Sequence, residues 1–203
     1  MELMARYEDN YFDLAIIDPP YSIGADKRQN RLSQDLKVSK RGRYKKYKES
    51  NWDNEKPKEQ YWLELKRVSK NYIIWGGNYF YNLKDSGVII WYKGNSGIFK
   101  EGELAKTNFK TFKVFQYSRS DAYINDCDIK IHPTQKPVKL YEFLLMTYGK
   151  EGDKILDTHL GSGSIAIACH NLGYDLTACE LDKEYFEAAM KRLQQHKSQK
   201  RLF

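Results

Sequence analysis

Short apolar runs alternate along the chain with apolar residues at helical spacing. The apolar runs, each bounded by turn residues, predict buried strands at residues 12–18, 71–75, 88–92, 154–157 and 174–180. The helical spacing predicts helices at residues 57–69, 137–148, 162–172 and 183–196. A short helix is expected at residues 2–7, and residues 93–120 are expected to form an irregular loop and hairpin with a strand near residues 112–117.

Strands that alternate with helices predict an α/β fold with a mostly parallel central sheet. The 203 residues are enough for one such domain, so residues 1–203 are expected to form a single unit. Ligands of such sheets bind outside the carboxyl ends of the strands. Three strand ends therefore become the candidate site: Asp18, Gly76, and the turn from Asp157 to Gly161.

The turn after the fourth predicted strand has the sequence DTHLGSGS and opens a helix. Gly161 and Gly163 let a ligand approach the backbone closely. Glu180 ends the next strand, where a carboxylate can accept hydrogen bonds from both hydroxyls of a ribose. The pattern predicts a nucleoside-type cofactor, and an ordinary tight turn between strand and helix is the alternative explanation.

Two residues near this turn bear on the class of cofactor. Ala166 stands where a dinucleotide-binding fingerprint has its third glycine, and because alanine is sometimes accepted there, NAD stays open. Asp157 precedes the turn, where a carboxylate can meet a cationic or amino group. That position suits a sulfonium cofactor with an amino-acid tail better than a pyrophosphate.

The first predicted strand ends in Asp18-Pro19-Pro20-Tyr21. Two prolines fix the backbone and remove two N–H donors, so the carbonyl groups are held rigidly. The Asp18 carboxylate and the Pro19 carbonyl form a double acceptor that matches the two donors of a planar amino group. Tyr21 adds a flat face on which a base can stack. An ordinary turn is the alternative, but these residue types favour holding an exocyclic base amine for attack on an electrophile.

The positive charge is concentrated in one segment. The chain has 34 Lys and Arg against 27 Asp and Glu, a net charge of +7. Residues 27–48 hold ten bases and one acid, so this segment alone carries +9. A solvated loop explains such a composition, and so does a segment that binds the phosphates of a nucleic acid.

Cysteine usage and hydropathy limit the class of protein further. Cys127, Cys169 and Cys179 lie far apart and form no CxxC pair, so neither a metal site nor a disulfide framework is expected. This usage fits a reducing cytoplasm. No apolar run approaches the roughly 20 residues that a membrane span needs, so no membrane partner is expected.

Five segments, taken in order, resemble the amino-group DNA methyltransferases that use S-adenosylmethionine: FDLAIIDPPY, YIIWGGNYF, IHPTQKPVKLYEFLL, ILDTHLGSGS and LTACELDKEYFEAA. The DPPY turn precedes the glycine turn, and HPTQKP comes directly before the latter, which is similar to the β group, mostly adenine-N6 methylases. The resemblance covers most of residues 10–195. It implies a Rossmann-like methyltransferase domain with a circularly permuted motif order, of the kind found in restriction–modification systems.

The resemblance also implies roles for the site residues. Asp18 and the Pro19 carbonyl would accept hydrogen bonds from the target amine, and Tyr21, after Pro20, would stack on the flipped base. Asp157 would lie near the methionine part of the cofactor and Glu180 on its ribose, while Thr134 and Lys136 would approach its carboxylate. The full set of expected cofactor contacts is Asp157, His159, Gly161, Ser162, Gly163, Glu180, Thr134 and Lys136.

Double-stranded DNA is the partner that the resemblance implies, and a homodimer is expected because dimers are frequent in the family. Residues 22–56 become a DNA-contacting insertion, with phosphate neutralisation assigned to Lys40, Arg41, Arg43, Lys45 and Lys46. Residues 93–130 become the region expected to recognise the target sequence.

Two departures from the family pattern are visible. His159 stands where the family usually has the Phe of Asp-Pro-Phe, so cofactor binding is expected to be weaker or differently tuned. Family members usually have another strand before residues 2–7; either an N-terminal edge strand is missing or the sheet is one strand shorter.

Three alternative functions stay open at this point. A cytosine-N4 methylase performs the same chemistry, but those enzymes more often have Ser in place of Asp18, which favours adenine-N6. A protein-glutamine or RNA methylase with an NPPY-type turn would have the glycine turn first. An inactive cofactor-binding or DNA-binding subunit has only His159 and the missing strand in its favour.

Overall fold

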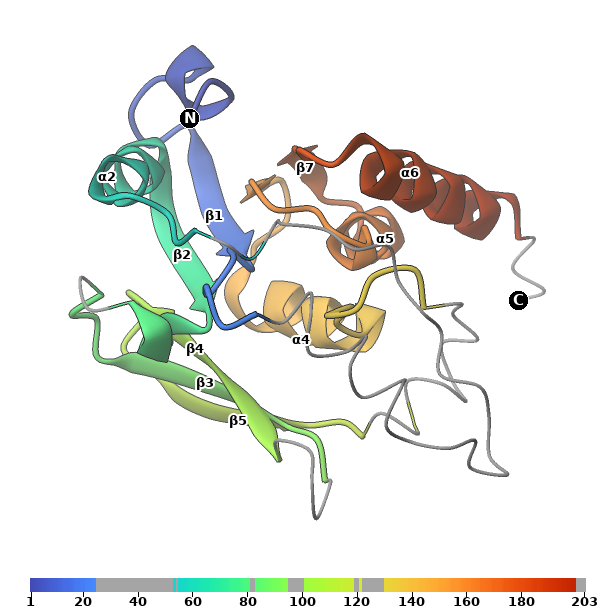
Figure 1. Cartoon of the computed structure of the whole chain (residues 1–203), viewed down its shortest axis with the longest axis horizontal. Coiled ribbons are helices and arrows are strands. Elements are labelled where there is room, and N and C mark those ends of the chain that lie inside the picture. Colours follow the sequence, from blue (N-terminus) through green and yellow to red (C-terminus); the bar gives the residue numbers. More distant parts are fainter. Residues whose placement is uncertain are drawn as a thin grey trace.

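A seven-stranded sheet forms the centre of the computed structural model, which describes residues 1–24, 53, 55–80, 83–94, 101–118, 121 and 130–199 (Figure 1). The strands are β1 (Phe12–Ile17), β2 (Ser69–Trp75), β3 (Gly87–Tyr92), β4 (Gly102–Thr107), β5 (Phe112–Gln116), β6 (Lys154–Asp157) and β7 (Asp175–Ala178). Their order across the sheet is β5-β3-β4-β2-β1-β6-β7. Of these described strands only β4 runs antiparallel to its neighbours.

Helices cover both faces of the sheet (Figure 1). One face carries α4 (Val138–Tyr148), α5 (Ser164–Leu172) and α6 (Lys183–Ser198), and the other carries α2 (Glu59–Val68). Two short 3-10 helices span Met4–Arg6 and Gly77–Tyr79. The two faces bury two separate hydrophobic clusters, as expected for a parallel sheet between layers of helices.

The apolar residues of strand β1 pack against the helices on both faces of the sheet. Leu14 and Ile16 pack in the cluster under α4 and α5, whereas Ala15 and Ile17 pack in the cluster under α2. All four side chains are buried. Because successive residues of a strand point to opposite faces, a central strand needs apolar residues at every position, and that is the pattern by which it was predicted.

The predicted α/β fold with a mostly parallel sheet is confirmed, and one strand within it was missed. Strand β4 lies inside the stretch that the sequence predicts to be irregular loop and hairpin. The residues it places with the buried layer are Glu103, Ala105 and Thr107, which are polar or small. Its pattern therefore lacks the apolar alternation that signals a half-buried strand.

At the other edge of the described sheet, β7 pairs with β6 alone. The expectation of a missing strand before residue 2 stays a prediction. Strand β1 precedes β6 along the chain, and that this order is a circular permutation also stays a prediction. None of the described helices is both long enough and apolar enough to cross a membrane.

Candidate functional site

The carboxyl ends of the parallel strands meet at one edge of the sheet. Strand β4 runs the opposite way, so it delivers its first residues to this same edge, with Gly102 opposite Tyr92 at the end of β3. The edge thus collects residues from five strands and the segments that follow them: Asp18, Gly76, Lys93, Glu103 and Asp157.

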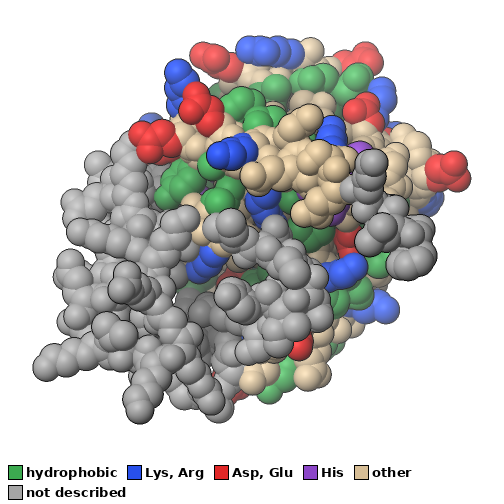
Figure 2. Space-filling model, turned by 90° about the vertical axis from the view of Figure 1, so that its right-hand side faces the viewer, with side chains coloured by type: hydrophobic (Ala, Val, Ile, Leu, Met, Phe, Trp, Pro, Cys, Tyr) green, Lys and Arg blue, Asp and Glu red, His purple; other side chains and the backbone are tan. Residues whose placement is uncertain are grey.

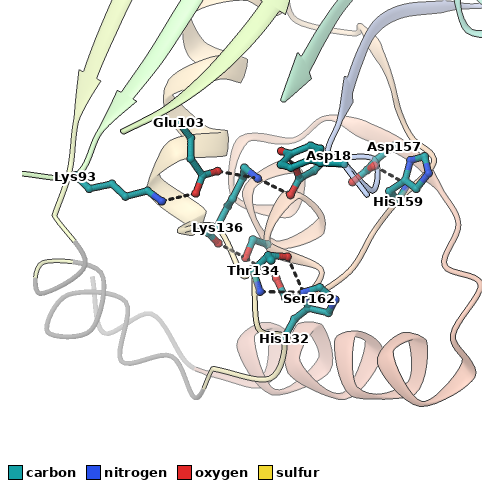
Figure 3. A network of polar contacts seen from close by, with 11 residues as sticks. Asp18, Lys93, Glu103, His132, Thr134, Lys136, Asp157, His159 and Ser162 are labelled. Carbon is teal, nitrogen blue, oxygen red and sulfur yellow. Dashed lines mark hydrogen bonds and ion pairs between the residues drawn. The ribbon is translucent and has the colours of Figure 1, made fainter. Parts of the chain in front are cut away.

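Two donors hold the Asp18 carboxylate (Figure 3). The Tyr21 hydroxyl donates to Oδ1, and the Lys136 ammonium donates to Oδ2. Lys136 is only 3% exposed and also pairs with Glu103 Oε2 at 3.2 Å. The other oxygen of Glu103 accepts from Lys93, which is equally buried. A row of alternating charges therefore leads from Asp18 into the β3–β4 side of the sheet.

Tyr21 is fixed by aromatic packing as well as by Asp18. Its ring stacks on Tyr79 with centroids 5.0 Å apart and planes at 18°. It lies directly against Gly76, where an added Cβ would be 2.1 Å from Tyr21 Cε1. Burial and the charge of Asp18 raise the pKa of the Tyr21 hydroxyl well above its ordinary value, so this group stays protonated and donates.

The backbone after the DPPY turn is bound by a second carboxylate, which the sequence did not indicate. Asp53 is 3% exposed, and its Oδ1 accepts from the N–H groups of Tyr21 and Ser22 at 2.8 Å each. Its Oδ2 accepts from the Ile23 N–H at 3.1 Å. Successive N–H groups around one anion form a nest, which here fixes the turn that carries Tyr21.

The glycine turn has the conformation that its sequence predicts. Gly161 has φ +52° and Gly163 has φ +71°, in the left-handed region that favours glycine. A Cβ at Gly163 would lie 3.0 Å from Ala189 Cβ, so glycine also allows α6 to pack closely. Glu180 Oε2 accepts from the Gly161 N–H at 2.8 Å, and Oε1 accepts from the Asp182 N–H at 3.0 Å.

Asp157 is the most deeply buried acid of the site, at 2% exposure. Burial raises its pKa to about 8; the hydrogen bond from the His159 N–H, at 2.9 Å, opposes this shift, and the charge of Asp18 adds to it. Among the described residues no cation forms an ion pair with Asp157. Close to neutral pH this carboxyl group is therefore mostly protonated.

His159 packs against an aromatic ring at the glycine turn. Its ring meets Tyr61 edge-on at a centroid distance of 5.6 Å. Thr158 joins the two side chains, because its hydroxyl lies 2.6 Å from Tyr61 Oη and 3.0 Å from His159 Nδ1. Burial lowers the pKa of His159 to about 4, so its imidazole is neutral.

The HPTQKP segment connects the DPPY turn to the glycine turn. The Lys136 carbonyl accepts from Ser164 Oγ at 2.7 Å, and buried Arg192 donates to the Ser162 carbonyl at 2.8 Å. Thr134 Oγ1 lies 3.0 Å from His132 Nδ1 (Figure 3). The contacts of Thr134 and Lys136 with a cofactor carboxylate stay predictions, and the Lys136 ammonium is directed at Asp18 and Glu103.

The basic residues assigned to DNA phosphates, Lys40, Arg41, Arg43, Lys45 and Lys46, lie outside the described residues, as does most of the 22–56 segment. On the face seen in Figure 2, basic side chains of the described residues are interspersed with acidic and apolar ones. Within the described ranges no group of three His, Cys, Asp or Glu side chains is arranged to hold a metal ion.

The chain is similar to known DNA methylases. A family model for DNA methylases, N6_N4_Mtase, matches residues 110–191. The type II methyltransferase M.HpaI of Haemophilus parainfluenzae is 28% identical over 240 aligned residues, which cover 95% of this chain and 71% of the relative.

Solved structures show the same fold. The M1.HpyAVI–SAM complex has a TM-score of 0.56 at 20% identity and covers 94% of this chain and 92% of its own. The cytosine-N4-specific PvuII DNA methyltransferase has a TM-score of 0.58 at 14% identity, with 94% and 82% covered. These two likenesses show a shared α/β fold. The family match over residues 110–191 and the similarity to type II methyltransferases support an N6/N4 DNA methyltransferase.

The contact between Gly76 and Tyr21 makes a first prediction. We expect Gly76→Ala to displace the Tyr21 ring, because the new Cβ would overlap it, and to lower methyl transfer about 100-fold. Gly173→Ala is the matched control: Gly173 also has positive φ, but an added Cβ there meets nothing within 4 Å. In both variants the alanine backbone at positive φ should lower the free energy of unfolding by about 1 kcal/mol, which thermal unfolding measures. Equal activities of the two would show that Tyr21 placement is unimportant.

Proposed function

We propose that the protein transfers a methyl group from S-adenosylmethionine to the N6 amino group of an adenine flipped out of duplex DNA. The observation that carries the proposal is Asp18 at the end of β1, with its carboxylate fixed by Tyr21 and Lys136 beside the glycine turn. A carboxylate in this position accepts a hydrogen bond from an exocyclic amine. In the family resemblance, Asp at this position favours adenine over cytosine.

The residues at the glycine turn fit S-adenosylmethionine. Asp157 is a buried carboxyl group that forms no ion pair with the described residues, and a cationic amino group beside it would favour its ionised form. Each Glu180 oxygen accepts one backbone N–H and has a further lone pair for a ribose hydroxyl. Gly161 leaves its backbone open, since an added Cβ would meet only the His159 carbonyl, at 3.8 Å.

When bound, the cofactor supplies an electrophilic methyl group on sulfur. Asp18 and the Pro19 carbonyl accept the two N–H groups of the target amine and direct its lone pair at that methyl group. The charge of Asp18 stabilises the positive charge that develops on the amine nitrogen. Positioning and electrostatics therefore supply the catalysis, and no covalent intermediate with the protein is required.

Flipping the base costs a few kcal/mol, and stacking on an aromatic side chain returns roughly 1–3 kcal/mol. Tyr21 is the residue at the turn that offers a ring for this purpose, although Tyr79 already stacks on it. The basic segment leaves the DPPY turn directly, so residues 22–56 are suited to neutralise phosphates near the flipped base. Residues 93–130 are assigned to target recognition.

Replacing Asp18 tests the proposed chemistry. We expect Asp18→Ala to lower methyl transfer to duplex DNA at least about 100-fold, because both the acceptor and the negative charge are lost. Radiolabelled methyl transfer measures the activity, and calorimetric titration of S-adenosylmethionine is the control that shows an intact cofactor site. Near-normal methylation by this variant would remove Asp18 from the mechanism.

The identity of the methylated base decides between adenine and cytosine. DNA methylated by the wild-type protein is digested to nucleosides and separated by chromatography. We expect N6-methyldeoxyadenosine as the methylated nucleoside in DNA treated with the wild-type protein. N4-methyldeoxycytidine would move the target to cytosine and leave the family chemistry unchanged.

Asp157 makes cofactor binding depend on pH. Its pKa is about 8 in the folded protein, and a cationic group binds the ionised form, so affinity for S-adenosylmethionine should rise between pH 6 and 7.5. The limiting slope is about tenfold per pH unit. Calorimetry in two buffers of different ionisation heat should detect proton release on binding.

The matched variant for this prediction is Asp157→Asn, which keeps the shape of the side chain but cannot titrate. We expect weaker binding that no longer changes between pH 6 and 7.5. A wild-type affinity that is constant over this range would contradict the assignment of Asp157 to the cationic part of the cofactor.

The basic segment is tested by the salt dependence of DNA binding. Replacing Lys40, Arg41, Arg43, Lys45 and Lys46 with Gln should flatten the slope of log Kobs against log[salt] by up to about 4.5, or about 0.9 per lost phosphate contact. A control removes the same charge from exposed lysines elsewhere, namely Lys110, Lys150, Lys183, Lys191 and Lys197. Equal slopes for the two variants would count against a dedicated DNA segment.

A further inference from the structure

Glu103 occupies the middle of the row of alternating charges (Figure 3). This row lies at the edge of the sheet where the carboxyl ends of the parallel strands meet, which we call the active edge. Its Oε1 accepts from Lys93, and its Oε2 pairs with Lys136 at 3.2 Å. Lys136 in turn binds Asp18, the acceptor proposed for the target amine. Glu103 therefore lies one residue away from the reacting group and reaches it through Lys136.

The antiparallel direction of β4 explains how this acid reaches the site. Glu103 is the second residue of β4 and pairs with Trp91 near the carboxyl end of β3. A parallel strand in this place would bring its last residue, not its first, to the active edge. The polar residue at the start of β4 therefore belongs to the site, although it comes from a strand that the sequence pattern does not indicate.

The position of the buried Lys136 ammonium depends on its two carboxylate partners, because its other surroundings include aromatic rings. Its ammonium lies 5.3 Å from the centre of the Trp75 ring, and the Lys93 ammonium lies 4.4 Å from that of Trp91. Lys136 is 3% exposed, and Asp18 and Glu103 are its ion-pair partners within the described part of the chain. Because removing an acceptor from a buried ammonium is costly, we expect Lys136 to move when Glu103 is lost.

We infer that Glu103 is a positioning residue for methyl transfer: it holds the Lys136 ammonium against Asp18 Oδ2. Lys136 and Tyr21 then occupy one position on each oxygen of Asp18, which fixes the plane of this carboxylate. The positions that remain point at the target amine. The inference rests on the proposed function, because it assigns Glu103 a part in the same reaction.

Charge balance supports the same arrangement. A lone ammonium beside Asp18 would oppose the positive charge that develops on the amine nitrogen. Glu103 offsets the charge of Lys136, and Lys93 offsets that of Glu103, so the four side chains together are neutral. A test must therefore distinguish the effect of the Lys136 position on kcat from the effect of the net charge of these four side chains.

The pKa of Lys136 follows from the same contacts. Burial alone would lower it, but the charges of Asp18 and Glu103 outweigh burial and raise it above its ordinary value of 10.5. Removing Glu103 takes away one of the two raising charges, so Lys136 should lose its proton at lower pH. The titratable groups that face Lys136 from the neighbouring elements are Asp18, Tyr21, Lys93, Glu103, Tyr141 and Asp157.

Four of these neighbours have shifted pKa values. Burial raises the pKa values of Tyr21 and Tyr141 well above normal, and Asp157 titrates at about 8. Although burial opposes it, the charges of Lys136 and Lys93 hold the pKa of Glu103 at about 2. A fall in the pKa of Lys136 should move the alkaline limb of the kcat profile to lower pH, and the Lys136 resonance described below distinguishes it from the two tyrosines.

The experiment compares Glu103→Gln with the double variant Lys93→Gln/Glu103→Gln in the full-length protein. For both we expect kcat to fall about 100-fold, S-adenosylmethionine Kd to change less than threefold, and the alkaline limb to begin at lower pH. The double variant has the same net charge as the wild type, so it also covers the case in which the single variant fails to fold. Recovery of kcat in the double variant would mean that net charge matters and would overturn the positioning role.

Glu142→Gln is the matched control, since Glu142 is a buried acid that pairs with Lys139 on α4, away from the active edge. It should keep the wild-type kcat and pH profile. Wild-type values for Glu103→Gln would overturn the inference while leaving the proposed function intact.

A second measurement does not depend on activity. The side-chain ¹⁵N resonance of Lys136, assigned by its loss in Lys136→Met, should titrate at lower pH in Glu103→Gln than in the wild type. If the wild-type protein transfers no methyl group to DNA, the proposed function fails, and this titration still decides whether Glu103 holds Lys136. An unchanged titration would overturn that part of the inference.

Discussion

The ion pair between Asp18 and Lys136 is the interaction on which the rest of the site depends. The two residues are 118 positions apart in the chain, and each ends or precedes a different element of the fold. The Lys136 side chain binds the DPPY turn, while its main-chain carbonyl binds Ser164 at the start of α5, beyond the glycine turn. Lys136 thus connects Asp18, the acceptor proposed for the amine, to the loop proposed to hold the cofactor. Because a buried charge is costly to leave unpaired, this tie also fixes the distance between the two turns.

Much of the fold could be predicted from the sequence, because its strands are buried on both faces and read as continuous apolar runs. The strand that could not be predicted is β4, whose buried side carries Glu103, Ala105 and Thr107. Of these, Glu103 pairs with Lys136, Ala105 lies in the core, and the Thr107 hydroxyl donates to the Tyr72 carbonyl. The strand therefore lacks the apolar alternation that signals a half-buried strand, and Glu103 breaks this pattern at the place where we infer a functional role.

The candidate residues at the strand ends could be predicted from the sequence, but the contacts between their side chains could not. Asp18, Asp157 and the glycine turn were indicated by their places at strand ends, and the sheet brings them to one edge. The direction of the Lys136 ammonium depends on which acids surround it, and Glu103 was hidden within an apparently irregular segment. Asp53 lacked any signal, because an isolated Asp in a polar stretch is indistinguishable from a solvated one until its backbone partners are known.

The two acids at neighbouring strand ends have different electrostatic surroundings, and this difference supports the roles proposed for them. Asp18 has an ammonium and a hydroxyl as partners, whereas Asp157 is buried with a backbone N–H and has a pKa of about 8. A carboxylate that already has a cation is suited to accept neutral donors such as the N–H groups of an amine. A carboxyl group that lacks one is suited to receive a cationic ligand, and it becomes charged only when that ligand arrives. The amino group proposed to meet Asp157 keeps its charge during methyl transfer, whereas positive charge develops on the amine beside Asp18, so the proposed role of Asp157 is in binding and that of Asp18 in the transition state.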